Sequence, residues 1–570
     1  MYTASTALLE ALSEAGVSYI FANFGSDHPA IVESIAEGRA NGRRIPAIVT
    51  CPNEMVALSA AQGFAQTSGQ AQAVLVHVDC GTQALAGALH NVARARTPVL
   101  ILAGASPVTQ EGELRGSRNE FIHWIQDVFD QRGIVRGYVK YENEVRSGRN
   151  VKQLVHRALQ IANSEPRGPV YLMAAREVLE EEVRPVSIDG AGWRPISPAA
   201  LPPDGVAAVA EALASARRPL VVTSYLGRNA DAVRELVRLA DRLAVGVHES
   251  APSHMNFPAD HPMYLGNQWN QQRQNPALAD ADFVLTLDSD VPWIPTVNKP
   301  RDDATIYHID IDPLKQQMPL WYIEATRVFR ADSATALSQI NECLESMTLD
   351  KRAVAARRSH YKKQHEARLA DLDRLEQPRN DVITPEYLTA CVNRHLDEDA
   401  IVLNEGITNY GVVVDHMRRK RPGTHFSSGG SSLGWHGGAA IGAKLAQPDK
   451  MVAALTGDGS YMFSIPSTVH WMARQYRTPF LQVIYNNRGW KAPKFSTLAQ
   501  HPDGYASRAN EIGVSFDPPP DYAQIAAAAG GAHAELVRRV EAVEPALARA
   551  VEVVRNEKRC AVLDVWLAHL

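Results

Sequence analysis

The sequence predicts an α/β protein made of three doubly wound domains, each built around a parallel sheet. Short apolar runs alternate with helix-compatible segments along the 570 residues, and this alternation is typical of βαβ units. The chain is 45% hydrophobic, so it can bury several cores, and its length favours about three domains. Two segments of different composition divide it: a Pro- and Gly-containing stretch from Arg184 to Pro203, and a highly charged stretch over residues 350–380.

We expect the first domain at residues 1–185, the second at 195–345 and the third at 381–570, with an exposed, charged helical linker at 346–380. Apolar runs define the expected elements. In the first domain these are a helix at Ala4–Ala15 and strands at Tyr19–Phe24, Ala73–Val78, Val99–Ala103 and Val170–Ala174. In the second they are strands at Leu220–Thr223, Phe283–Leu287 and Thr305–Asp310.

Composition also narrows the range of partners. The formal net charge is -5, so the chain has no general basic surface for nucleic acid, and we expect no nucleic-acid binding. No apolar run reaches the roughly 18 residues of a membrane span, and no secretory signal is recognisable. The five cysteines show no Cys-x-x-Cys spacing. These features lead us to expect a soluble cytoplasmic protein with reduced thiols and no membrane association.

The most informative motif lies in the third domain. Met451–Thr456 is a short apolar run that predicts a buried strand, and Gly457-Asp458-Gly459-Ser460 follows it directly. A second such strand is predicted at Phe480–Tyr485, and Asn486-Asn487 follows that one. Because ligands of open α/β sheets bind outside the carboxyl ends of strands, both motif halves should meet in one crevice.

The residue types of this motif favour a magnesium site that anchors a diphosphate. Mg²⁺ prefers oxygen ligands in octahedral geometry, usually one or two protein groups completed by phosphate oxygens and water. Asp458, Asn487 and the carbonyl of Gly489 supply such a set. Each half alone is more often an ordinary turn or loop, and the interpretation depends on their spaced combination.

With this motif the chain resembles the thiamine diphosphate superfamily of acetolactate synthase, benzoylformate decarboxylase and pyruvate oxidase. The resemblance covers nearly the whole sequence and includes two further motifs, Phe24-Gly25-Ser26-Asp27-His28 and the segment from Cys51 to Ala57. It implies a pyrimidine-binding, a middle and a diphosphate-binding domain, and it implies Mg²⁺ and thiamine diphosphate as cofactors. The family includes members with and without FAD, and we expect none here.

The resemblance also assigns cofactor contacts. Glu54 matches the glutamate that hydrogen-bonds the pyrimidine ring, although a glutamate at a helix start is otherwise commonly a dipole partner. Leu433 matches the apolar side chain beneath the bent cofactor, and the carbonyl of Ser431 would hold the pyrimidine amino group. Further contacts are expected from two turns, at Glu405, Gly406 and Ile407 and at Gly457, Gly459 and Ser460.

Substrate chemistry is expected around the N-terminal motif. Ser26, Asp27 and His28 lie in the loop that carries polar groups in benzoylformate decarboxylase-like and pyruvate decarboxylase-like relatives, and His77 matches a catalytic histidine of the first type. His77 could equally be a hydrogen-bonded core histidine. The segment Val291–Pro295 has no histidine where the benzoylformate type carries a second one, which argues against a simple decarboxylase with two histidines.

The resemblance therefore implies an enzyme, a lyase or transferase, that acts on 2-oxo acids by decarboxylation or by acyloin-type carboligation. One alternative is a 2-hydroxyacyl-CoA lyase with an acyl-CoA substrate. Another is a non-catalytic, thiamine diphosphate-binding regulatory subunit. Members of the family assemble with sites between subunits, so we expect a homodimer or homotetramer.

Overall fold

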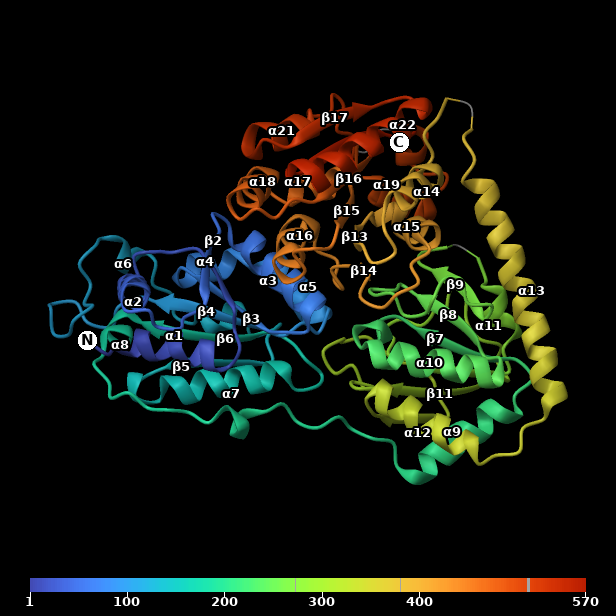
Figure 1. The fold of residues 1–570 in the computed structure, drawn as a ribbon, viewed down its shortest axis with the longest axis horizontal. Coiled ribbons are helices and arrows are strands. Elements are labelled where there is room, and N and C mark those ends of the chain that lie inside the picture. The colour runs from blue at the N-terminus through green and yellow to red at the C-terminus, as the bar shows by residue number, and fades with distance from the viewer. Residues whose placement is uncertain (272, 380, 510–512, 570) are drawn as a thin grey trace.

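The computed structural model describes residues 1–271, 273–379, 381–509 and 513–569. It contains three six-stranded sheets, one in each third of the chain, and the strands of the described residues pair in parallel within them (Figure 1). Helices connect most of the successive strands, whereas several crossovers of the middle sheet contain no helix among the described residues. The predicted fold class is confirmed, whereas the domain boundaries stay a prediction.

The N-terminal sheet has the order β2-β1-β3-β4-β6-β5. Its strands are β1 (Tyr19–Ala22), β2 (Ala47–Thr50), β3 (Gln72–Val76), β4 (Val99–Ala105), β5 (Tyr141–Val145) and β6 (Val170–Ala175). Its helices are α1 (Ala4–Glu14), α2 (Pro29–Ala40), α3 (Glu54–Ser68), α4 (Val78–Ala84), α5 (Ala86–Arg94), α6 (Ile122–Ile125), α7 (Val151–Asn163) and α8 (Arg176–Glu180). β3 is shorter than predicted: Val78 begins α4, and its backbone N–H donates to Asp27 instead of to a strand.

The middle sheet has the order β12-β11-β10-β7-β8-β9. Its strands are β7 (Pro219–Thr223), β8 (Gly246–Ser250), β9 (Tyr264–Gln268), β10 (Phe283–Leu287), β11 (Thr305–Asp310) and β12 (Arg327–Arg330). Its helices are α9 (Pro203–Ser215), α10 (Ala230–Leu243), α11 (Pro276–Asp280) and α12 (Ser333–Glu345). Because chain order reverses between β7 and β10, the carboxyl ends of these two strands flank a topological switch point.

The C-terminal sheet has the order β14-β13-β15-β16-β18-β17. Its strands are β13 (Ile401–Glu405), β14 (His425–Phe426), β15 (Val452–Gly457), β16 (Leu481–Asn486), β17 (His533–Val537) and β18 (Ala561–Trp566). Its helices are α14 (Pro385–His395), α15 (Tyr410–Met417), α16 (Trp435–Ala446), α17 (Asp458–Phe463), α18 (Pro466–Gln475), α19 (Lys491–Gln500), α20 (Tyr505–Ala509), α21 (Tyr522–Gly530) and α22 (Val540–Glu552). β15 and β16 are adjacent, so the two halves of the motif end side by side.

Two connections join the domains. Residues 184–202, which include a short 3-10 helix at Gly190–Trp193, run below the N-terminal domain to the middle domain, and α13 (Lys351–Leu375) forms a long helix along the outer edge of the middle domain (Figure 1). The charged stretch is therefore helical, as its composition predicts. Among the described residues, no helix is long and apolar enough to cross a membrane.

The N- and C-terminal domains are joined through α3 and α16. Gly442 on α16 lies so close to α3 that a Cβ there would be 1.9 Å from the carbonyl oxygen of Ala60. Their small residues let the two backbones approach closely, and buried side chains of both helices belong to one hydrophobic core.

Candidate active site

A cavity of about 310 Å³ opens at the carboxyl ends of β15 and β16; we call it the β15–β16 crevice. Ten of the sequence-predicted residues line it: Gly406, Ile407, Ser431, Leu433, Gly457, Asp458, Gly459, Ser460, Asn487 and Gly489. They come from four separate segments of the C-terminal domain. Parallel pairing brings these segments together, because it places the carboxyl ends of the strands at one edge.

Asp458 and Asn487 make this crevice suited to a cation. The carboxylate of Asp458 accepts the backbone N–H groups of Gly459 and Gly489, each at 2.9 Å. Burial raises the pKa of Asp458 to about 6, although these N–H groups oppose the rise. Oδ1 of Asn487 is buried and has no hydrogen-bond partner among the described residues. A cation between them would satisfy the amide oxygen and compensate the carboxylate.

The donor set fits Mg²⁺ with a phosphate ligand. The crevice offers one carboxylate, one side-chain amide oxygen, hydroxyls and backbone oxygens, and the described residues hold no group of three or more His, Cys, Asp or Glu side chains that could bind a metal by themselves. Mg²⁺ typically completes such a partial set with phosphate oxygens and water.

The turn that carries Asn487 is fixed by its neighbour. The side-chain amide of Asn486 makes both contacts: its Nδ2 donates to Asp564 at 2.8 Å, and its Oδ1 accepts the backbone N–H of Arg488 at 3.0 Å. Asn486 is fully buried at the end of β16. The first asparagine of the pair therefore holds the turn, and the second presents its oxygen to the crevice.

Glu405 has a different environment from the residues predicted beside it. Its carboxylate accepts the backbone N–H groups of Gly434 at 2.6 Å and His436 at 2.9 Å, and Nδ1 of His436 lies 2.6 Å away. Glu405 does not line the β15–β16 crevice but caps the N-terminus of α16. Its contacts position the Gly-rich loop that ends at Leu433.

A second cavity of about 330 Å³ lies where the three domains meet; we call it the junction cavity. It shares Ile407, Ser431 and Leu433 with the β15–β16 crevice, so the two cavities adjoin along this wall. Ile407 has a φ of 50°, which is a strained conformation for a β-branched residue. Trp269 and Tyr410 stack with their ring centroids 4.1 Å apart and give the junction cavity an aromatic wall.

The predicted catalytic residues form a separate cluster in the N-terminal domain. Oδ1 of Asp27 lies 2.5 Å from Nδ1 of His77, and Oδ2 lies 3.2 Å from Nε2 of His28. The hydrogen bond to Asp27 raises the pKa of His77 above its ordinary value, although partial burial opposes this. Burial lowers the pKa of His28. Asp27 and His28 are buried, whereas the His77 side chain is 22% exposed and can meet a ligand.

His123 is a member of this cluster that sequence reasoning missed. Its Nε2 lies 3.3 Å from Oγ of Ser26, and its Nδ1 accepts the backbone N–H of Asn119 at 3.3 Å. Burial and the nearby Arg176 guanidinium lower the pKa of His123. Nη1 of Arg176 lies 3.1 Å from the same Nε2, and because a guanidinium can only donate, this nitrogen is placed to accept from Arg176. No motif marks the segment around His123, so a single sequence gave no signal for it.

Glu54 lies apart from both cavities. It is the first residue of α3, next to the N-cap Asn53, whose side chain accepts the N–H of Val56 at 3.2 Å. It is partly buried, and a Cβ at Gly81 would be 3.4 Å from its Oε1. Neither cavity is lined by Glu54, His77 or the Ser26–His28 loop. Within one chain, the residues predicted for catalysis and those predicted for diphosphate binding occupy different places.

Three family models of one class of enzyme match successive parts of the chain. Residues 2–134 match the family model "Thiamine pyrophosphate enzyme, N-terminal TPP binding domain", residues 206–318 match the central domain of the same enzymes, and residues 406–565 match their C-terminal TPP binding domain.

Individual relatives are distant but similar over most of their length. The chain is 26% identical over 511 residues to benzoylformate decarboxylase of Pseudomonas aeruginosa, covering 88% of this chain and 89% of the relative. It is 23% identical to 2-hydroxyacyl-CoA lyase 2 of Caenorhabditis elegans, covering 78% and 72%. The solved structure of a thiamine diphosphate-dependent 4-hydroxybenzoylformate decarboxylase from Rhodococcus jostii RHA1 superposes with a TM-score of 0.78 at 22% identity, covering 100% of this chain and 99% of the other.

Proposed function

Because the chain belongs to the thiamine pyrophosphate enzyme family, we propose that it is a Mg²⁺- and thiamine diphosphate-dependent enzyme that breaks or forms a carbon–carbon bond next to the carbonyl of a 2-oxo acid. The reaction would be decarboxylation, acyloin-type carboligation, or both. The observation that carries the proposal is the buried, unpartnered Oδ1 of Asn487 beside Asp458 in the β15–β16 crevice.

In this proposal the crevice holds the diphosphate end of the cofactor. Asp458, Asn487 and the Gly489 carbonyl would hold the magnesium ion, and the backbone around Gly457 and Gly459 would lie against the phosphates. Leu433 and Ile407 form the wall toward the junction cavity, where the reacting end and the substrate would meet. When bound, thiamine diphosphate supplies an electron sink for cleavage next to a carbonyl.

The side chains of the N-terminal cluster would then handle protons and orient the substrate. A protonated His77, favoured by Asp27, can donate a proton to a developing alkoxide. Ser26, whose Oγ lies 3.3 Å from Nε2 of His123, would offer its hydroxyl to a substrate carboxylate. Glu54 would donate to the pyrimidine ring of the cofactor.

We further propose that the complete site forms between two copies of the chain. Among the residues that the structure describes, those lining the β15–β16 crevice lie between 406 and 493, and Glu54 is not one of them. A second copy that presents Glu54, Ser26 and His77 to this crevice would supply the missing groups, which requires a homodimer or homotetramer.

A product screen tests the activity. Protein loaded with Mg²⁺ and thiamine diphosphate is offered pyruvate, benzoylformate and other 2-oxo acids, and in parallel 2-hydroxyacyl-CoA thioesters. Carbon dioxide release, with or without a ligated product, is the expected result. Formyl-CoA and an aldehyde without carbon dioxide would instead establish the acyl-CoA lyase, the activity that names the Caenorhabditis elegans relative. Cofactor binding without hydrogen–deuterium exchange at the thiazolium C2 would indicate a non-catalytic subunit.

A further inference from the structure

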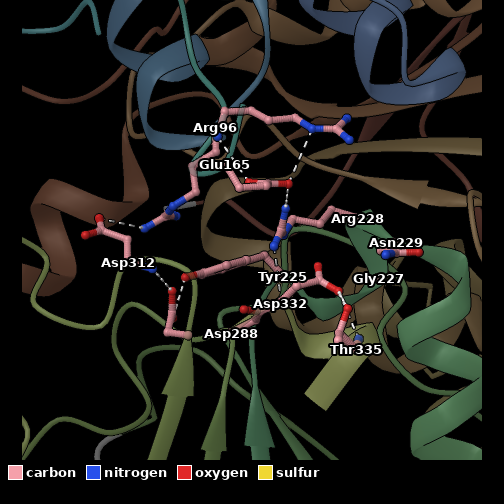
Figure 2. Close-up of polar contacts among 12 residues, drawn as sticks. Arg96, Glu165, Tyr225, Gly227, Arg228, Asn229, Asp288, Asp312, Asp332 and Thr335 are labelled. Atoms are coloured by element: carbon pink, nitrogen blue, oxygen red, sulfur yellow. Dashed lines mark hydrogen bonds and ion pairs between the residues drawn. The ribbon is translucent and has the colours of Figure 1, made fainter. Parts of the chain in front are cut away.

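The switch point of the middle sheet is the place where a doubly wound domain ordinarily binds a nucleotide. Here it lies outside the carboxyl ends of β7, β10 and β11. Side chains of the protein itself converge on this place from two domains (Figure 2).

Tyr225, which follows β7, lies across the strand ends. It is buried, and its hydroxyl is 2.6 Å from Oδ2 of Asp310 at the end of β11. The ammonium group of Lys315 contacts the same hydroxyl at 2.6 Å and the same carboxylate oxygen at 2.7 Å. The Lys315 side chain is fully buried. A phenol ring and an ion pair thus lie at the switch point of the middle sheet.

The N-terminal domain covers this group from outside. The Arg96 guanidinium makes two hydrogen bonds to the carboxylate of Asp290, at 2.8 and 3.0 Å, and its centre lies 4.5 Å above the Tyr225 ring. Lys315 contacts Asp290 as well, at 2.8 Å. Arg96 thereby stacks on the tyrosine and shares one carboxylate with the buried lysine.

A second ion pair joins the same two domains beside Tyr225. Arg228 pairs with Glu165 of the N-terminal domain and lies 3.7 Å from Asp288 at the end of β10 (Figure 2). Burial raises the pKa of Asp288 to about 7, although the positive charge of Arg228 opposes the rise. Arg96, Arg228 and Lys315 are thus each paired with a carboxylate of the protein.

We propose that this network occupies the nucleotide position of the middle domain, so that the domain binds neither a flavin nor another nucleoside diphosphate there and is instead fastened to the N-terminal domain through Arg96 and Glu165. A diphosphate would have to displace the Tyr225 ring, separate buried ion pairs and face Asp288, Asp290 and Asp310. Arg96, Tyr225 and Asp290 also line the junction cavity, so the same network forms one wall of the proposed substrate space.

Binding titrations test whether the middle domain binds a nucleotide. The wild-type protein is first loaded with Mg²⁺ and thiamine diphosphate, and FAD or ADP is then added. Flavin fluorescence quenching and calorimetry should show no saturable binding of either compound. Micromolar, saturable binding of FAD or ADP would overturn the proposal. Neither readout depends on turnover, so failure of the proposed activity would leave this result interpretable.

Matched methionine substitutions test the fastening role. Lys315→Met leaves Asp290 and Asp310 without their shared cation and should lower the first thermal unfolding transition by about 5 °C or more. Lys299→Met, which removes an exposed lysine of the same domain paired with Asp302, should leave that transition unchanged. Equal transitions in the two variants would refute the role.

A milder variant covers the case in which Lys315→Met does not fold. Tyr225→Phe keeps the ring beneath Arg96 and removes only the hydroxyl shared by Lys315 and Asp310. It should lower the transition by about 1–3 °C, because one buried hydrogen-bonding group is lost. An unchanged transition in Tyr225→Phe would show that this hydroxyl does not hold the network together.

Discussion

Nδ1 of His77 lies 2.5 Å from Oδ1 of Asp27, and this contact joins two residues that are 50 positions apart in the chain. The carboxylate is buried, whereas the imidazole reaches the surface of the domain. Asp27 also accepts the N–H of Val78 at 3.1 Å, so it fixes the turn that carries His77. A buried carboxylate thus orients an accessible imidazole and raises its pKa.

Asp27→Asn should lower the pKa of His77 to its ordinary value or below, because the hydrogen bond to the carboxylate is lost while partial burial remains. In the wild type, the raised pKa contributes stability that is fully present below the ordinary histidine value near 6.5. That contribution is lost as the pH rises through the folded-state pKa, and the variant should lack it. NMR titration of the imidazole and unfolding temperatures from pH 5 to 9 measure both effects.

Asp79→Asn is the control for this titration. Asp79 raises the pKa of His77 only weakly compared with Asp27. A His77 titration that moves as far in Asp79→Asn as in Asp27→Asn would contradict the assignment.

Glu54→Gln should leave cofactor binding largely intact but slow exchange of the thiazolium C2 proton by about 100-fold, the scale for loss of one acid–base partner. Exchange followed by NMR on quenched samples gives the rate. The exposed Glu33 on α2 provides the control Glu33→Gln. A Glu54→Gln protein that exchanges at the wild-type rate would remove Glu54 from this role.

Co-expression of Glu54→Gln and Asp458→Ala chains tests whether sites form between subunits. Each variant alone should be inactive, but a mixed dimer has one site in which both residues are intact. About a quarter of wild-type activity is expected, because about half of random dimers are mixed and half of their sites are complete. No recovery in purified mixed dimers would place Glu54 and Asp458 of one chain in the same site.

Asp458→Ala should weaken Mg²⁺-dependent binding of thiamine diphosphate by at least about 10-fold, since even outer-shell partners of a metal contribute that much. Intrinsic fluorescence quenching provides a titration, because Trp490 also lines the β15–β16 crevice. Asp503→Ala, at an exposed position of the same domain, is the control. Wild-type affinity in Asp458→Ala would refute the magnesium site.

Glu405→Ala should destabilise the C-terminal domain by about 3 kcal/mol, because the N–H groups of Gly434 and His436 lose their acceptor inside the protein. Glu405→Gln keeps an acceptor and should lose less. Thermal unfolding without cofactor separates this role from ligand contact. If Glu405→Ala unfolds at the wild-type temperature and only binds cofactor weakly, the residue acts on the ligand and not as a helix cap.

The parts of this protein that could be read from sequence are those set by local patterns. The strands around Asp458 and Asn487 were predicted because parallel strands buried on both faces are continuous apolar runs, and turn residues mark their ends. Adjacent strands then put both motif halves in one crevice. Glu405 belongs to the same turn as Gly406 and Ile407, but its direction into α16 depends on packing that no local pattern encodes.

Sequence by itself determined the three parallel-sheet domains and the residue types of the β15–β16 crevice, because hydrophobic periodicity and turn chemistry are local properties of the chain. Tertiary structure decided which distant groups meet: His123 with Ser26, Asp27 with His77, and Arg96 with Tyr225 and Asp290. These contacts join segments that are from tens to nearly two hundred residues apart in the chain. Burial strengthens their hydrogen bonds and ion pairs, and this burial exists only once the domains have packed.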